Sequence, residues 1–351
     1  MSNGGTLRRP AVPPPVRIRR DVNNLSANDP IITFYEKAIG QMQKGNKLDD
    51  PLSWRYQAAI HDYTRNVAIT SDRRNDPVNP DPFADDKDVL PPDRDTFWRQ
   101  CRHGSWFFLS WHRMYLHFFE KTIMKIVAGL PGGPTDWALP YWNYSSSAAA
   151  ALLPAPFRNP TLPDDPNVPE KGRKNHLHVA ERTPNANAGS PFLDASDTNL
   201  DCLKTKPFGE VTAPAGSFGG PKIDNHPPGR GGALESTPHN AVHGALGGAN
   251  GFMGGFSTAP LDPMFWLHHC NIDRLWEVWV QRQKMLGNLD RNPKEKDPTD
   301  TVPRNWLDLK FDFHDAAGNP VKITSREVLN TRLPPLSYEY EDTSDPFKGA
   351  P

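Results

Sequence analysis

Two strongly apolar segments place the tightest constraint on how this chain can fold. They are residues 105–130, SWFFLSWHRMYLHFFEKTIMKIVAGL, and residues 263–284, which begin PMFWLHHCNIDRLW. Apolar residues lie nearly all round a helix drawn through either segment, and such a helix belongs in the centre of a fold. Each segment nevertheless contains histidines, and burying imidazoles costs free energy unless hydrogen bonds or a metal satisfy them. The sequence therefore predicts two central helices that carry buried histidines.

The remaining segments are shorter or irregular. Helical spacing and capping residues predict further helices over 29–43, 53–65 and 236–246. Residues 71–96 and 145–235 are rich in Pro, Gly, Asn and Asp and are expected to be loops, and residues 1–20 form a Pro/Arg-rich arm. Alternating apolar residues predict strands from residue 305 onward and around Tyr338 and Tyr340. The expected fold is mainly α with a small strand-rich C-terminal segment.

Composition excludes several classes of partner. The 351 residues include 40 basic and 41 acidic side chains, so no global positive field attracts nucleic acid or an anionic membrane. No apolar run approaches the ~18 residues of a membrane helix, and the N-terminal residues lack the apolar core of a secretory signal. The three cysteines are too few and too far apart for a disulfide framework. The compartment and the oligomeric state stay open.

Histidines form the main candidate site. His239 and His243 are four residues apart, so on one helix both rings can reach the same ion. The two groups of histidines together offer three-plus-three imidazoles, a donor set that suits copper, zinc, iron or nickel. Asn240 stands where the zinc protease motif HExxH has its glutamate, so zinc hydrolysis is a secondary alternative. The groups are His61, His103 and His112, and then His239, His243 and the adjacent His268 and His269.

Several motifs occur in the order found in one family. The segments QCRHGSWFFLSWHRMYLHFFE (100–120), ESTPHNAVHG (235–244) and DPMFWLHHCNIDRLW (262–276) resemble the paired copper-binding motifs of type 3 copper proteins, the tyrosinases, catechol oxidases and hemocyanins. WRYQAAIH (54–61) and LPYWNY (139–144) are similar to the intervening patterns. VRIRRDV (16–22) and Tyr338-Glu339-Tyr340 resemble the motifs at the two ends of the catalytic domain.

The resemblance implies a specific set of metal ligands. It assigns His61, His103 and His112 to one copper ion and His239, His243 and His269 to a second. His269 is preferred because it lies four residues before Asp273, and His268 would then support the ligands from outside. The other histidines, expected to be solvated or buried in the core, are His117, His176, His178, His226 and His314. Cys101 lies two residues before His103, the relation in which fungal-type relatives join the sulfur to a ring carbon of the histidine.

Further residues are assigned roles around the metals. Phe108 and Phe265 each lie four residues before a ligand histidine and are expected to pack on it. Phe256 aligns with the family's aromatic gate over the copper pair. Glu235 and Asn240 correspond to the pair that holds a water proposed to remove the phenol proton, although Glu235 could equally cap a helix.

The resemblance also implies an architecture and an activity. We expect a single catalytic domain over 1–351, with a core of about 16–342 and no C-terminal lid domain, in which a central four-helix bundle holds a dicopper site. The implied reaction uses O2 to hydroxylate monophenols and to oxidise o-diphenols to o-quinones. A catechol oxidase without monophenolase activity and a hemocyanin-like O2 binder are the alternatives. The expected partners are phenolic small molecules and O2. A copper-delivery partner stays an open alternative.

Overall fold

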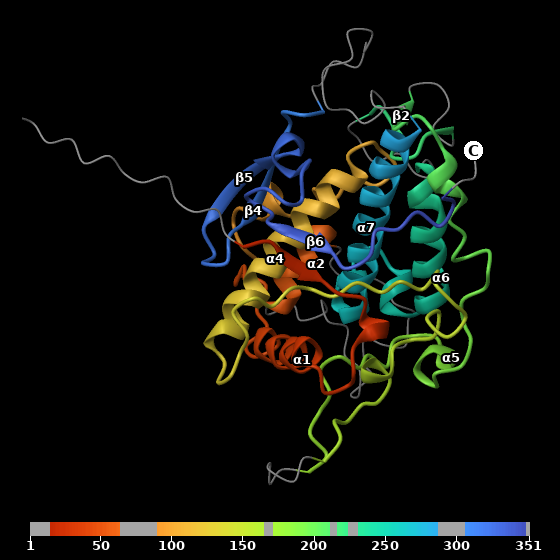
Figure 1. The fold of residues 1–351 in the computed structure, drawn as a ribbon. Coiled ribbons are helices and arrows are strands. Elements are labelled where there is room, and N and C mark those ends of the chain that lie inside the picture. The colour runs from red at the N-terminus through yellow and green to blue at the C-terminus, as the bar shows by residue number, and fades with distance from the viewer. Residues whose placement is uncertain are drawn as a thin grey trace, which may run out of the picture.

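The computed structural model describes residues 15–63, 90–164, 171–210, 216–223, 231–286 and 306–348. The longer helices are α1 (Pro30–Met42), α2 (Trp54–His61), α4 (Phe108–Gly129), α6 (Ala241–Gly247) and α7 (Pro263–Met285). Short helical turns are α3 (Arg94–Phe97) and α5 (Pro184–Asn187). The strands are β1 (Arg17–Arg19), β2 (Gly209–Glu210), β3 (Gly220–Pro221), β4 (Lys310–His314), β5 (Pro320–Thr324) and β6 (Tyr338–Tyr340). The described fold is thus mainly helical, as predicted (Figure 1).

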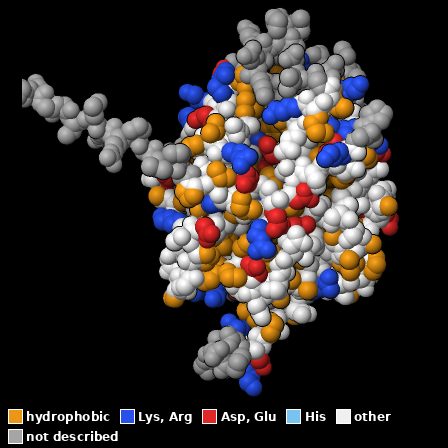
Figure 2. All heavy atoms as spheres, in the orientation of Figure 1, with side chains coloured by type: hydrophobic (Ala, Val, Ile, Leu, Met, Phe, Trp, Pro, Cys, Tyr) orange, Lys and Arg blue, Asp and Glu red, His pale blue; other side chains and the backbone are white. Residues whose placement is uncertain are grey.

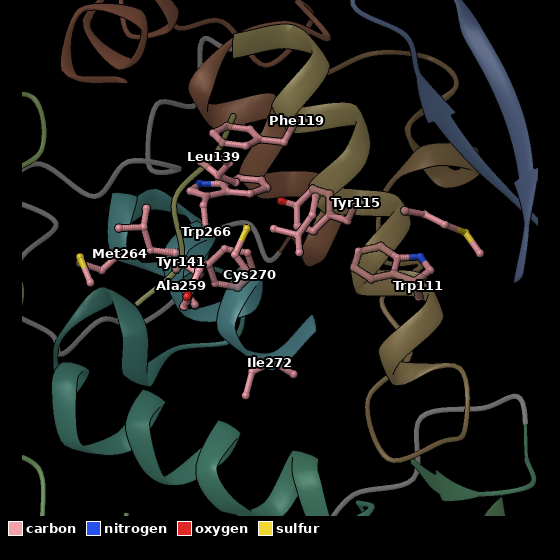
Figure 3. Close-up of a cluster of buried hydrophobic side chains, with 14 of the residues drawn as sticks. Trp111, Tyr115, Phe119, Leu139, Tyr141, Ala259, Met264, Trp266, Cys270 and Ile272 are labelled. Carbon is pink, nitrogen blue, oxygen red and sulfur yellow. The ribbon is translucent and has the colours of Figure 1, made fainter. Parts of the chain in front are cut away.

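Helices α4 and α7 form the centre of the molecule. They pack against each other, and α1 covers another part of α4. The Phe119 ring of α4 lies flat on Trp266 of α7, with ring centroids 3.4 Å apart, and Tyr115 packs on the same indole at 4.7 Å (Figure 3). Burying rings of this size contributes several kcal/mol of hydrophobic free energy. This aromatic layer holds the histidine-bearing parts of both helices in a fixed relation.

Capping side chains set where the helices begin. The Asp29 side chain accepts from the backbone N–H of Ile31 at the start of α1, and Ser53 accepts from that of Tyr56 at the start of α2. Asp262 accepts from Met264 N and begins α7. Each bond satisfies a backbone donor that a helix start otherwise leaves unpaired. These caps explain why the predicted starts of the helices at 29, 53 and 263 agree closely with the structure.

Two predicted helices differ from the structure. The helix predicted over 53–65 ends at His61, because Asp62 is extended, with φ −158° and ψ 149°. The helix predicted over 236–246 starts with an irregular turn, Glu235–Asn240, in which Thr237 is not helical and precedes a cis Pro238. A proline lacks the N–H that a regular helix needs at that point, which accounts for the irregularity.

Predictions for the loops and ends also need correction. Residues 17–19 of the predicted arm are the strand β1, and residues 94–97 of the predicted 71–96 loop form the short α3. The parts of that loop from 71 to 89, and residues 1–14, lie outside the described residues. Where described, residues 145–235 are irregular apart from short elements, as predicted. The strands predicted near the C-terminus are β4, β5 and β6.

A buried ion network joins the two ends of the fold to its centre. Strand β1 pairs in parallel with β6, so that Arg17 lies opposite Tyr338 and Arg19 opposite Tyr340. The fully buried Arg19 guanidinium makes two 3.1 Å hydrogen bonds to the Glu120 carboxylate of α4. It also lies 3.4 Å from Asp273 of α7. The network therefore fixes the terminal strands across both central helices.

The visible surface carries mixed charge. Basic and acidic side chains are interspersed over the face drawn in Figure 2, in keeping with the net charge of −1. Within the described ranges, no helix has both the length and the apolarity that crossing a membrane requires.

Candidate metal centre

Eight side chains in the described residues form two groups suited to hold metal ions. In each group, one potential ligand atom per residue lies within 4.8 Å of all the others. The groups are also neighbours, since the rings of His112 and His269 stack with centroids 4.4 Å apart. The first group comprises His61, Cys101, His103 and His112, and the second comprises His239, His243, His268 and His269. The structure thus brings together all six histidines that the sequence assigned as ligands.

Backbone carbonyl oxygens orient three of these imidazoles. The Nδ1 of His61 bonds to the Phe256 carbonyl at 2.9 Å, and that of His112 bonds to the Phe108 carbonyl at 2.8 Å. The Nδ1 of His243 bonds to the Met253 carbonyl at 2.8 Å. Because a carbonyl oxygen only accepts, each Nδ1 must carry the proton. In the neutral ring, Nε2 is then left with the lone pair that a metal needs.

His239 is oriented mainly by a side chain, with the Glu235 carbonyl farther away at 3.3 Å. Its Nδ1 donates to the Asn240 amide oxygen at 2.9 Å, and its buried Nε2 makes no hydrogen bond. Burial, reinforced by the neighbouring histidines, lowers the pKa of His239 and His269 well below the usual value. Burial also lowers the pKa of His243 to about 4. These rings are therefore neutral near pH 7, which is the form that binds metal ions.

One distance tests directly whether a metal fits. The Nε2 atoms of His243 and His269 are 3.2 Å apart. Two nitrogens about 2.05 Å from one tetrahedral ion would be separated by about 3.3 Å. Neutral imidazoles at this spacing, with a buried Nε2 of His239 beside them, fit an ion that prefers nitrogen ligands.

His268 lies within the second histidine group, whereas the sequence predicts it outside the ligands. Its side chain is fully buried, and its ring centroid is 4.9 Å from that of His243. The assignment of His269 rather than His268 as the ligand stays a prediction. Of the histidines expected outside the site, His117 and His314 are buried away from both groups, and His176 bonds to Gln43. His226 lies outside the described residues.

Three phenylalanines surround the histidine rings. Phe108 is fully buried and packs on His112 at 4.6 Å and on His239 at 4.7 Å, so it touches both groups. Phe265 packs on His269 at 4.1 Å. Phe256 is 45% exposed, and its ring lies perpendicular to that of His103 at a centroid distance of 4.3 Å. Phe256 therefore stands where the first group meets solvent.

Cys101 lies beside the ring of His103. Its buried Sγ is 3.8 Å from both Nδ1 and Nε2 of that ring, and 3.5 Å from Nε2 of His112. The sulfur therefore lies against the His103 ring. Burial raises the pKa of the Cys101 thiol well above its usual value, so the free side chain is a neutral thiol.

Glu235 is a buried carboxyl group next to the first cluster. Its two oxygens accept from the backbone N–H of Gly104 at 2.8 and 3.0 Å, and Gly104 directly follows His103. Burial raises the pKa of Glu235 to about 8, despite backbone hydrogen bonds that favour the ionised form. The backbone groups that hydrogen-bond its carboxyl group belong to Gly104 and Gly232, which lie outside the turn that Glu235 begins.

Sequence reasoning missed two polar contacts that support the site. Ser257 donates to the Asp62 carboxylate at 2.6 Å, next to His61. Arg182 makes two 2.7 Å hydrogen bonds to Asp262, the cap of α7, and both side chains are fully buried. Arg182 lies in the irregular 145–235 region, where no periodic pattern signals a partner for a residue 80 positions away.

The fold is mainly helical, and α2, α4, α6, the turn before α6 and α7 converge on two adjacent histidine groups that could each hold a metal ion. Comparison with known families agrees with this arrangement. The common central domain of tyrosinase matches residues 51–282, and the polyphenol oxidase middle domain matches residues 297–350. The chain belongs to the tyrosinase family.

Individual relatives include both tyrosinases and catechol oxidases. Tyrosinase HcTyr1 of Hahella sp. (strain CCB-MM4) is 36% identical over 93% of this chain and 63% of its own length. Catechol oxidase B of Solanum tuberosum is 28% identical over 93% of this chain and 50% of its own length. The solved structure of latent apple tyrosinase superimposes with a TM-score of 0.62 at 28% identity, covering 97% of this chain and 65% of that one. The chain thus spans about half to two thirds of the length of these relatives.

Proposed function

We propose that this protein is a dicopper oxidase that uses O2 to ortho-hydroxylate monophenols and to oxidise o-diphenols to o-quinones. In this proposal α2, α4, α6 and α7 act as a four-helix bundle and hold one copper ion at each histidine group. His61, His103 and His112 bind the first ion, and His239, His243 and His269 bind the second. The 4.4 Å stacking of His112 on His269 carries the proposal, because it brings ligands of both ions to one small volume. O2 and the phenol are the co-substrates.

Copper, when bound, would supply the electron transfer to and from O2. The chain itself supplies neutral imidazoles, orients them through Nδ1, and surrounds them with the buried rings of Phe108 and Phe265. This apolar shell excludes water and fixes the rotamers of the ligands. Phe256 is exposed above His103, so a phenol that enters the site would meet its ring.

Glu235 and Asn240 would assist the removal of the phenol proton. Free phenols ionise near pH 10, so a monophenol is almost fully protonated at pH 7. A buried carboxyl group with a pKa of about 8 is suited to exchange protons near neutral pH through a water molecule. Asn240 is exposed, and its amide oxygen is engaged by His239, which leaves the amide N–H groups to hold that water.

Kinetics with paired substrates test this proposal. Glu235→Gln and Asn240→Gly are expected to reduce turnover of a monophenol such as tyrosine about 10-fold more than turnover of its catechol. That ratio corresponds to about 1.4 kcal/mol of transition-state free energy. Ser236→Ala changes an exposed neighbour in the same turn and should leave both rates unchanged. A wild-type protein that oxidises catechols but no monophenol, even after a catechol primer, would be a catechol oxidase.

Metal analysis by mass spectrometry distinguishes a dicopper oxidase from a zinc hydrolase and, together with a turnover assay, from an O2 carrier. A dicopper oxidase should contain two copper ions per chain and turn over a catechol in air. Bound zinc in place of copper would favour a hydrolase. Copper with reversible O2 uptake but without catechol turnover would favour an O2 carrier.

We also propose a thioether bond between Cys101 and His103. Its formation would join Sγ to a ring carbon of His103 and remove the S–H and C–H hydrogens as two protons and two electrons, which O2 would take up to give hydrogen peroxide; bound copper would mediate the electron transfer. The closeness of Sγ to the ring, 3.8 Å from each of its nitrogens, supports this proposal. The bond would restrict His103, which the sequence places in a loop before α4, to a single orientation.

A further inference from the structure

Residues 252–258, here called the 252–258 loop, contact both histidine groups through their backbone. The Phe256 carbonyl accepts from His61 Nδ1 at 2.9 Å, and the Met253 carbonyl accepts from His243 Nδ1 at 2.8 Å. His61 ends α2 and belongs to the first group, whereas His243 lies in α6 and belongs to the second. Only two residues separate the two carbonyls along the chain. A shift of this loop would therefore alter the orientation of one ligand in each group.

Internal contacts make the loop a stiff unit. The Thr258 hydroxyl donates to the Phe252 carbonyl at 2.9 Å, and Gly255 N donates to the same carbonyl at 3.1 Å. The loop also packs backbone to backbone on the end of α6, since a Cβ atom on Gly254 would lie 2.1 Å from the Gly248 carbonyl oxygen. Glycine is required there because any side chain would force the two backbones apart. The loop can therefore move mainly as a whole.

A second side-chain hydrogen bond, besides that of His61, ties the loop to the end of α2. Ser257 is buried, and its hydroxyl donates to Asp62 at 2.6 Å. Asp62 directly follows His61, so the loop holds His61 twice, through its ring and through the next residue. Hydrogen bonds to carboxylate groups are among the stronger ones in proteins.

The same loop carries the ring that faces the substrate. Phe256 lies between the Met253 and Ser257 contacts and is exposed, with its ring 5.3 Å from His61 and 4.3 Å from His103. We propose that the 252–258 loop is a positioning element that links the Phe256 gate to one ligand of each metal, and that the Asp62–Ser257 hydrogen bond sets its position. Asp62 and Ser257 are positioning residues in this view. The inference rests on the proposed dicopper oxidase function.

Copper retention and substrate affinity together test whether the 252–258 loop links the Phe256 gate to the metal ligands. Ser257→Ala and Asp62→Ala should each release copper to a strong chelator about 10-fold faster than the wild type, and should raise KM for a catechol several-fold with a smaller change in kcat. Asp62→Asn keeps an acceptor oxygen and should restore most of both properties. The double variant should match the single ones, because both remove the same interaction.

Ser325→Ala is the matched control. Ser325 is fully buried and donates to Ser110 at 2.9 Å, away from the loop, so its loss removes an equivalent hydroxyl contact. If Ser257→Ala and Asp62→Ala behave like Ser325→Ala, the inference is wrong. It is also wrong if either property changes without the other, because the gate and the ligands are then not linked. A wild-type protein that holds no copper, or oxidises no catechol, would instead contradict the proposed function.

Discussion

Replacing Glu120 by glutamine should destabilise the fold in a pH-dependent way. Burial alone would raise the pKa of this fully buried carboxyl group, but attraction by Arg19 and Arg17 outweighs burial and lowers the pKa to about 2. Its usual value is 4.5, so the shift is about 2.5 units. At 1.36 kcal/mol per unit, the ionised group contributes about 3.4 kcal/mol to the free energy of unfolding.

The sign of the pH dependence follows from the lowered pKa. The contribution is fully present above pH 4.5 and is lost as the pH falls towards 2, where the folded state takes up the proton. Glu120→Gln should therefore cost about 3 kcal/mol at pH 7, in the range known for broken buried ion pairs, and progressively less below pH 4.

Denaturant unfolding of the copper-free wild type and variant, from pH 7 down to pH 3, measures this difference. Copper-free samples are compared so that loss of metal at low pH does not contribute. Glu339→Gln is the control, because its partner Arg332 is largely exposed and such surface pairs contribute little. A cost for Glu120→Gln that is equal at pH 7 and pH 3 would refute the reasoning, since the loss would then come from packing alone.

Three further predictions concern the site. His269→Ala should leave about one copper per chain by mass spectrometry, whereas His268→Ala should keep two with affinity weakened ~10–100-fold; the reverse order would exchange their roles. After loading with copper in air, the intact mass should be two hydrogens below the sequence mass, and Cys101→Ser should abolish this difference; an unchanged wild-type mass would exclude the thioether with His103. Gly254→Ala should lower thermal stability by about 1–3 kcal/mol, because its Cβ meets a carbonyl oxygen, and an unchanged melting temperature would show that the loop can move aside.

The sequence predicts those parts of the fold that depend on local patterns. The helix expected over 263–284 is observed as Pro263–Met285, because the Asp262 cap and a continuous apolar run act within a few residues of one another. Strand β1 was missed because its partner β6 lies about 320 residues away, and three residues carry no period of their own. Long-range pairing of this kind depends on the finished fold.

In the candidate site, too, features carried by single side chains can be predicted from the sequence, whereas features that depend on the finished fold cannot. The histidines were found because imidazole chemistry belongs to the side chain and is visible in the sequence. The carbonyls of Phe256 and Met253, which orient His61 and His243, could not be predicted, since every residue has a carbonyl group and only the fold decides where it points.

The parallel pairing of β1 with β6 gives the fold a particular response to mechanical force. The chain enters β1 at Arg17 and leaves β6 after Tyr340, so tension on the two ends pulls the paired strands in opposite directions along their length (Figure 1). Backbone hydrogen bonds flank the pair, from Arg17 to Ser337 and from Glu341 to Arg19. The force acts along the strands and therefore perpendicular to these bonds, so they must break together rather than one after another. Because Arg19 is also bound to Glu120 of α4, shearing these strands would expose a buried charge at the same moment, which adds to the resistance of this small sheet.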